Sequence, residues 1–163
     1  MAMIDELLFI KTFREHKAET ELQKSRARLG IAAQSERDAQ QALEDFVAQA
    51  TADELRWYQE LCSRVVKPRD IADVQNDVAG LRQKELEHNG QWQAAQQHHV
   101  KAKDEFQGAT TRMRDASTAR QKFFELARNH HSAVAREVER KEELELEELA
   151  NVVREREEWS THD

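Results

Sequence analysis

A repeat of mostly apolar residues at every third or fourth position constrains the fold most, and it runs through residues 71–137. The a positions of this heptad are Ile71, Val78, Glu85, Trp92, His99, Phe106, Met113, Arg120, Ala127 and Val134. Its d positions are Val74, Leu81, His88, Ala95, Ala102, Ala109, Ala116, Phe123, His130 and Glu137. A spacing of about 3.5 residues makes one narrow stripe on an α-helix, and such a stripe is buried against a partner helix. The second half of the chain is therefore predicted to be one helix of a coiled coil.

A matching stripe precedes this one, and the single proline of the chain, Pro68, lies between them. The members of the first stripe are Ala18, Leu22, Ser25, Leu29, Ala32, Glu36, Ala39, Leu43, Phe46, Ala50, Trp57 and Leu61. Proline disfavours the α conformation at the residue before it, so the first helix should end close to Pro68. The sequence predicts an all-α fold: a long two-helix antiparallel coiled-coil hairpin in a single domain over 1–163. The helices should cover about 4–64 and 71–158, with a turn at 66–70 and Asp70 capping the second helix.

Side-chain size suggests how the two stripes pair. If Leu43 faces Ala95 and Trp57 faces Leu81, large side chains meet smaller ones throughout, and facing residue numbers sum to about 138. This register leaves residues 136–163 as a C-terminal helical overhang without a partner. The overhang is rich in Glu and Arg, which can form i,i+4 pairs such as Glu137 with Lys141.

The composition narrows the class of protein. Charged residues make up 35% of the chain and aromatic residues 6%, as in coiled coils, and the sustained heptads argue against the alternative of disorder. The net charge of −7, with both signs interspersed, argues against nucleic acid as a partner. The single Cys62 suits a reducing cytosol, and the absence of a long apolar run or signal peptide predicts no membrane insertion.

No residue pattern predicts catalysis, a cofactor or a metal. His98-His99 and His130-His131 invite a metal interpretation, but the Glu-x-x-His pairs that bundles use for metal ions are missing. We therefore expect His99 and His130 to be polar residues of the seam. The carboxylates should lie on exposed helix faces, where nothing raises their pKa or excludes water, so we predict that the protein is not an enzyme.

Two groups of apolar residues fall outside the stripes and are candidate partner-binding residues. Phe9, Ile10 and Phe13 should face outward near the N-terminus, with Phe124 beside them on the second helix. Exposed apolar clusters usually mark contact surfaces, and the alternative is a local third helix or a dimer that covers this one. Lys11, Arg14 and Lys17 flank the cluster, which favours an acidic partner. Near the turn, Tyr58 should also point outward, although one exposed tyrosine is a weak signal.

Several segments, in the same order along the chain, resemble the YscO/FliJ family of stalk proteins of bacterial type III secretion. They are Ile10-Lys11-Thr12-Phe13-Arg14 with the following Ala18-Glu19, Arg69-Asp70-Ile71, the stretches 78–85 and 122–128, and the Glu-rich segment 142–148. Each is weak alone, because coiled coils share composition, but their order and spacing make the match more specific.

The resemblance implies a non-catalytic, cytoplasmic component of the secretion apparatus. Such proteins look like the central helices of rotary ATPases. They insert into the hexameric secretion ATPase ring, contact the cytoplasmic ring of the export gate protein, and bind the chaperones of translocator proteins. The implied gate contact lies near the hairpin turn, which here points to Tyr58, Leu61 and Leu86. The alternatives are an unrelated coiled-coil scaffold or tether, and an oligomeric chaperone-like holdase.

Overall fold

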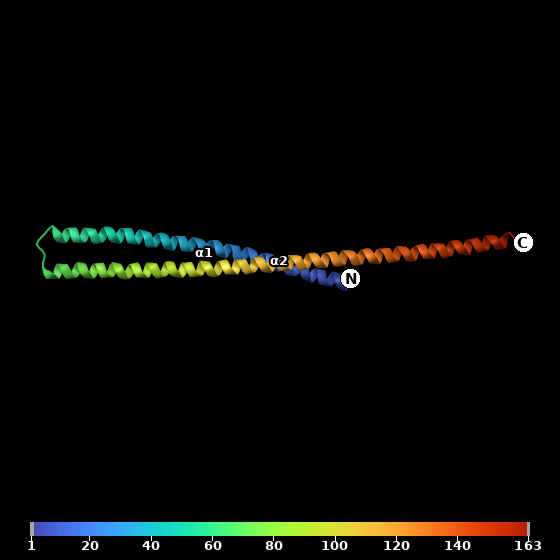
Figure 1. Cartoon of the computed structure of the whole chain (residues 1–163), viewed down its shortest axis with the longest axis horizontal. Helices are drawn as coiled ribbons and strands as arrows, with labels where there is room; N and C mark the ends of the chain where they lie inside the picture. The colour runs from blue at the N-terminus through green and yellow to red at the C-terminus, as the bar shows by residue number, and fades with distance from the viewer. Residues whose placement is uncertain (1, 163) are drawn as a thin grey trace. The chain divides into compact units, whose positions relative to one another are not determined.

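The protein consists of two helices, seen in a computed structural model that describes residues 2–162 (Figure 1). Helix α1 covers Met3–Cys62, helix α2 covers Pro68–Ser160, and residues 63–67 connect them. No strand occurs among these residues. The predicted all-α hairpin of two long helices is confirmed.

The chain divides into two compact units, and both helices contribute to each. One unit is Glu19–Arg112, which contains the turn and the adjoining parts of α1 and α2. The other combines the described residues of Met1–Ala18 with those of Met113–Asp163. The single-domain assignment stays a prediction.

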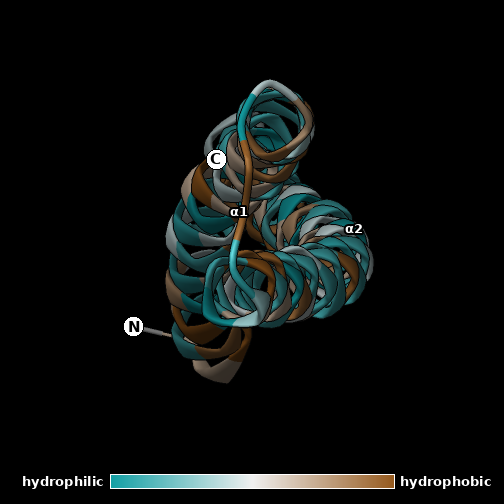
Figure 2. Cartoon of the chain, turned by 90° about the vertical axis from the view of Figure 1, so that its left-hand side faces the viewer, coloured by the Kyte–Doolittle hydropathy of each residue, from teal (hydrophilic) through white to brown (hydrophobic). Residues whose placement is uncertain are grey.

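The seam of the hairpin follows the predicted heptads and is lined by small side chains. Both helices carry hydrophobic (brown) and hydrophilic (teal) segments (Figure 2), as expected of helices with an apolar heptad on a polar background. Among residues 2–162, the buried residues are Ser25, Ala32, Ala50, Ala102, Ala109 and Ala127, and all six lie on the two predicted stripes. Larger stripe residues such as Leu43, Trp92 and Phe106 are half-buried beside them. Alanine in the seam lets two helices approach closely, and the longer side chains then cover the edges of the contact.

The turn lies at residues 63–67, about three residues earlier than the predicted 66–70. Pro68 is the first residue of α2, a position where its missing N–H costs no hydrogen bond. Asp70 caps the helix from the third position, because its Oδ2 accepts a hydrogen bond from the backbone N–H of Lys67 at 3.1 Å. The predicted ends of the helices, near residues 64 and 71, shift for the same reason.

The earlier turn also changes the register of the seam. The predicted pairing would place Phe46 opposite Trp92, but the Phe46 ring stacks on His88, with 4.8 Å between ring centroids. Glu54 likewise pairs with Arg82 at 3.0 Å. Both partners on α2 lie closer to the turn than predicted, by up to one helical turn. Size alternation is a poor guide to register here, because an alanine-rich seam accommodates large residues in several registers.

Candidate protein-docking surfaces

The N-terminal apolar cluster, which we define as Phe9, Ile10, Phe13 and Phe124, is exposed as predicted. The side chains are 72%, 43%, 63% and 50% accessible, in that order. They remain accessible because the seam beside them uses other residues, notably half-buried Leu8 and buried Ala127. In Figure 2, brown hydrophobic segments of α1 lie next to the N label.

A cation–π contact sets the two helices side by side at the cluster. The Lys11 ammonium lies 5.2 Å from the centroid of the Phe123 ring, and Phe123 itself is half-buried. The contact places the turn of α2 that carries Phe124 alongside residues 9–13 of α1. The structure therefore supports the predicted grouping, and the binding role of the cluster stays a prediction.

Two polar contacts join α1 to α2 on either side of this cluster. Nε of Arg120 donates to Oε2 of Glu15 at 2.7 Å, and Nε2 of His131 lies 2.7 Å from Oδ1 of Asp5. The hydrogen bond from Arg120 holds the pKa of Glu15 below its usual range, against the opposing effect of burial. The hydrogen bond from His131 likewise lowers the pKa of Asp5. Both carboxylates are thus stabilised in their charged form.

The residues implied for gate binding differ in exposure. Tyr58 is 43% exposed and Leu86 is 64% exposed, whereas Leu61 is half-buried, consistent with its place in the stripe. Leu86 lines a shallow groove with Leu43 and Val47, away from the turn. The role of Tyr58, Leu61 and Leu86 in gate binding stays a prediction.

Two further apolar side chains near the turn were missed by sequence reasoning. Leu55 is 58% exposed and Val65 is fully exposed. Leu55 lies outside the heptad stripe, which was a usable signal, whereas the exposure of Val65 follows only from the earlier position of the turn. Both are therefore further exposed apolar side chains in the part of the chain that precedes α2.

The histidines find partners other than metal ions. His99 Nδ1 pairs with Glu36 Oε2 across the seam, as expected for a polar seam residue. His130 is exposed and not in the seam as predicted, because the seam ends at Ala127 beside the first turns of α1. Residues 2–162 contain no group of three or more His, Cys, Asp or Glu side chains that could hold a metal ion. The expectation of no metal or cofactor stays a prediction.

The grooves seen along the described parts of the helices are shallow. One of them lies between α1 and α2, is open to solvent, and is lined by residues that include Arg28, Ala32, Lys101 and Ala102. An open groove does not exclude water or perturb a titratable group. Neither described helix contains a stretch long and apolar enough to cross a lipid bilayer.

Exposed apolar residues also continue along the last part of α2. They include Val138, Leu146, Leu149 and Val153, which are 49%, 65%, 61% and 52% accessible. The sequence interpretation treated this segment as a Glu- and Arg-rich overhang and missed them. The spacing of residues 146, 149 and 153, at three and four positions, was the available signal.

Comparison with known proteins agrees with the sequence resemblance. Residues 4–152 match the family model described as "Type III secretion protein YscO". The crystal structure of the type III secretion protein YscO from Vibrio parahaemolyticus is similar, with a TM-score of 0.83 and 22% sequence identity. That match covers 90% of this chain and 92% of the Vibrio chain, and it shows a shared fold. A search of curated proteins gives no significant match. Because the family model covers most of the chain, the protein belongs to the YscO family of type III secretion proteins.

Proposed function

We propose that this protein is a non-catalytic stalk and escort component of a bacterial type III secretion system. In this proposal it works in the cytoplasm, at the inner face of the apparatus, where it links the secretion ATPase ring to the export gate. It also binds translocator chaperones, a role that rests on family membership alone. The helical hairpin supports a mechanical role, because its exposed side chains can contact partners at positions far apart in sequence.

The observation that carries the proposal is the exposure of the N-terminal apolar cluster beside a closed seam. Burial of apolar surface stabilises a complex by about 25 cal/mol per Å². Because these side chains are exposed in the free protein, a partner that covers them gains this free energy of binding. Lys11, Arg14 and Lys17 lie in the same turns of α1 and can steer an acidic surface towards the cluster. We assign the secretion ATPase to this surface.

The export gate is assigned to the surface near the turn, with Tyr58 and Leu61 as contacts. This assignment depends on the family resemblance and on the exposure of the Tyr58 ring. Leu86, which is 64% exposed on α2, is the third residue that the resemblance implies for this contact.

Paired substitutions test the assignment of two partners to two surfaces. Phe9→Ser with Phe13→Ser should abolish binding to the purified secretion ATPase and leave binding to the cytoplasmic domain of the export gate protein intact. Tyr58→Ala with Leu61→Ala should have the opposite effect. Because Leu61 is half-buried, Tyr58→Ala alone serves as a second variant that spares the seam.

The matched control is Ile31→Ser. It removes an exposed apolar side chain that belongs to neither of the two surfaces. All variants should keep the helicity of the wild type in circular dichroism. If both double variants lose the same partner, or if neither loses one, the two-surface proposal fails. If the Ile31→Ser protein loses ATPase binding equally, the cluster has no special role.

A further inference from the structure

A groove lies between α1 and α2 at the level of Ile31, within the unit Glu19–Arg112. Its floor contains two alanines of the seam, Ala32 and Ala102, each 8% exposed. Because these floor residues are small, side chains of a third helix can reach the seam here. The other side chains that line the groove are Arg28, Ile31 and Ser35 from α1 and His98, Lys101 and Glu105 from α2.

The chain covers the other side of the seam at this level but leaves Ile31 exposed. Arg26 occupies the heptad position that flanks the seam on the side away from the groove. Its guanidinium lies over the Phe106 ring, 5.9 Å from the ring centroid. Ile31, at the edge of the groove, is 68% exposed. The groove therefore offers an apolar contact that the hairpin itself does not use.

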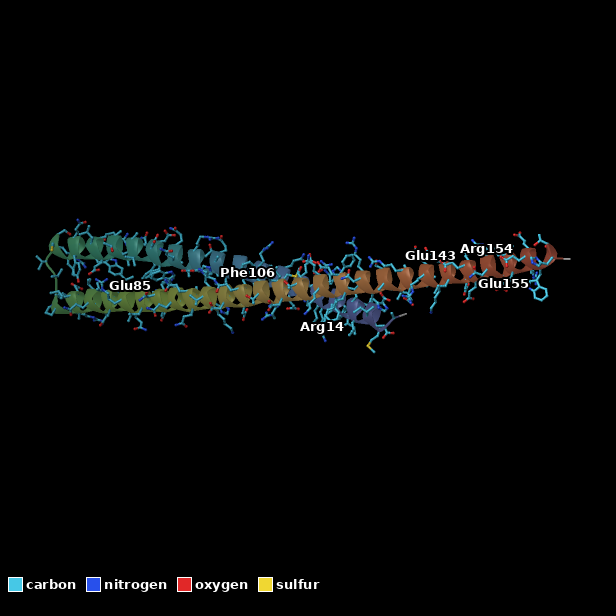
Figure 3. The ribbon with its side chains drawn as sticks, turned by 45° about the vertical axis from the view of Figure 1, so that its right-hand side comes forward. Arg14, Glu85, Phe106, Glu143, Arg154 and Glu155 are labelled. Carbon is cyan, nitrogen blue, oxygen red and sulfur yellow. The ribbon has the colours of Figure 1, made fainter. Side chains whose placement is uncertain are left out.

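The level of the hairpin that carries the groove is basic, although the chain is acidic overall. Residues 24–35 and 98–112 contain six Lys and Arg residues and two carboxylates. The adjoining part toward the turn, residues 36–62 and 70–97, contains four Lys and Arg residues and twelve carboxylates. Figure 3 shows Glu85 in this acidic part and Phe106 at the basic level, further from the turn along α2. A negatively charged ligand is therefore attracted to the groove and repelled by the part of the hairpin beside it.

The cations at the groove are available to a ligand. Within residues 2–162, no ion pair joins Arg28, Lys101 or Arg112 to a carboxylate. One guanidinium nitrogen of Arg112 lies against α2 at Gly108, 3.4 Å from the point that a Cβ would occupy. Gly108 follows Lys101 by one heptad, so Arg112 adds positive charge on the same side of α2. Three cations thus face one carboxylate of the groove, Glu105.

Shape and charge together select among the possible occupants of the groove. A second copy of the chain docked groove to groove would bring the same cations together, which is unfavourable. A membrane surface does not reach a floor that lies between two helices. A long nucleic acid would be repelled by the acidic part toward the turn and would leave Ile31 without an apolar partner. A helix with one apolar face flanked by Asp and Glu matches both the small-residue floor and the basic edges.

We propose that this groove docks an acidic amphipathic helix of another protein. Apolar side chains of that helix cover Ile31 and pack on Ala32 and Ala102, while its flanking carboxylates pair with Arg28 and Lys101. None of these residues belongs to the N-terminal apolar cluster or to the contacts assigned to the export gate. The proposal therefore stands or falls independently of the two partners proposed above.

The experiment measures binding of two labelled helical peptides to the full chain by fluorescence anisotropy. Both peptides carry Leu at heptad positions a and d, and both are used below the concentration at which they self-associate. One has Glu at the flanking e and g positions, and the other has Lys there. We expect the Leu/Glu peptide to bind at least about tenfold more tightly than the Leu/Lys peptide. This order is the reverse of the one that the net charge of −7 predicts.

Three changes in the groove test its two features separately. Ile31→Ser removes the exposed apolar side chain, and Arg28→Gln with Lys101→Gln removes the two cations. Each should weaken Leu/Glu binding by at least about tenfold. Ser35 is exposed, so Ser35→Glu places a negative charge in the groove without disturbing the seam, and it should weaken binding by at least about threefold.

Matched controls make the same changes outside the groove. Val100→Ser removes an apolar side chain that is 59% exposed on α2. Arg37→Gln with Lys103→Gln removes two positive charges from exposed positions. Both controls, and Phe9→Ser with Phe13→Ser, should leave binding within about twofold of the wild type. Circular dichroism should show wild-type helicity for every variant.

The proposal is overturned if neither peptide binds, if the Leu/Lys peptide binds as tightly as the Leu/Glu peptide, or if Ile31→Ser binds like the wild type. It is also overturned if Arg37→Gln with Lys103→Gln weakens binding as much as the change of the two groove cations. Two further results would assign the groove to another occupant. One is self-association in sedimentation equilibrium that Ile31→Ser abolishes, and the other is binding of a single-stranded oligonucleotide that Arg28→Gln with Lys101→Gln abolishes.

Discussion

Nε of Arg120 on α2 lies 2.7 Å from Oε2 of Glu15 on α1, and the Glu15 side chain is only 16% exposed. The hydrogen bond from Arg120 lowers the pKa of Glu15 below its ordinary value of 4.5. When the folded-state pKa is lowered, the group stabilises the fold above its unfolded pKa, and this contribution is lost as pH falls through the folded pKa. The contact between the helices should therefore weaken in acid.

We expect Glu15→Gln to lower the melting temperature at about pH 6, and we expect the difference from the wild type to shrink at about pH 3. Thermal unfolding followed by circular dichroism at several pH values measures this. Glu87→Gln, at an exposed position, is the control and should track the wild type throughout. A constant difference between Glu15→Gln and wild type from pH 6 to pH 3 would show that the pair has no role in acid stability.

Trp92 offers a test of packing in the seam. Its Nε1 is buried and has no hydrogen-bond partner among the described residues, so Trp92→Phe should change stability by less than about 1 kcal/mol. Trp92→Ala also removes the half-buried ring and should cost about 3 kcal/mol. Urea unfolding gives both values. Trp159→Ala, the same change at a residue 82% exposed, should stay within about 0.5 kcal/mol. Equal losses for the two alanine variants would contradict the placement of Trp92.

Ala109 is the most buried residue of the seam, at 1% exposure. Ala109→Leu should destabilise the protein by about 1–3 kcal/mol, because added methylene groups in a closely packed contact force the helices apart. Ala133→Leu makes the same change on the exposed part of α2 and should be nearly neutral. The free energies of unfolding of the two variants decide the matter, and a neutral Ala109→Leu would show that the seam is loosely packed.

The turn can be tested through the cap of α2. Asp70→Ala removes the acceptor for the Lys67 N–H and should cost about 1 kcal/mol, whereas Asp70→Asn should retain part of the contact. Asp73→Ala, at an exposed position one turn later, should change stability by less than about 0.5 kcal/mol. Chemical denaturation compares the three variants. If Asp70→Ala matches Asp73→Ala, the cap does not stabilise the turn.

The heptads predicted the seam residues between Val74 and Ala127 but neither the register nor the ends of the seam, because Ile71, His130 and Val134 are exposed. Burial of Ala32 and Ala109 follows from periodicity, since any partner helix would cover that stripe. The pairing of Phe46 with His88 depends on where the turn lies, and the turn depends on Pro68 serving as the first residue of α2. Local sequence signals mark such a boundary only to within a few residues.

The candidate surfaces were predictable to different extents. Phe9 and Phe13 fall outside the stripe, so their exposure followed from the heptad. Leu86 also falls outside the stripe and is exposed, and its role with Tyr58 in gate binding stays a prediction. Leu149 and Val153 were missed because the glutamates between and around the apolar residues dominate the composition of that segment. What each surface binds depends on the chemistry of partners, which the sequence of this chain does not contain.

The small-residue seam also bears on how this family can diverge. Among the described residues, those that become buried are alanines and one serine, and no large side chain is fully enclosed. Adhesion between the helices is therefore spread over many weak layers, and each layer tolerates replacement by another residue of similar size. Selection for the fold then needs to conserve only the spacing of small and apolar residues along the two helices. A seam of this kind is compatible with the shared fold of this chain and the Vibrio protein at 22% identity.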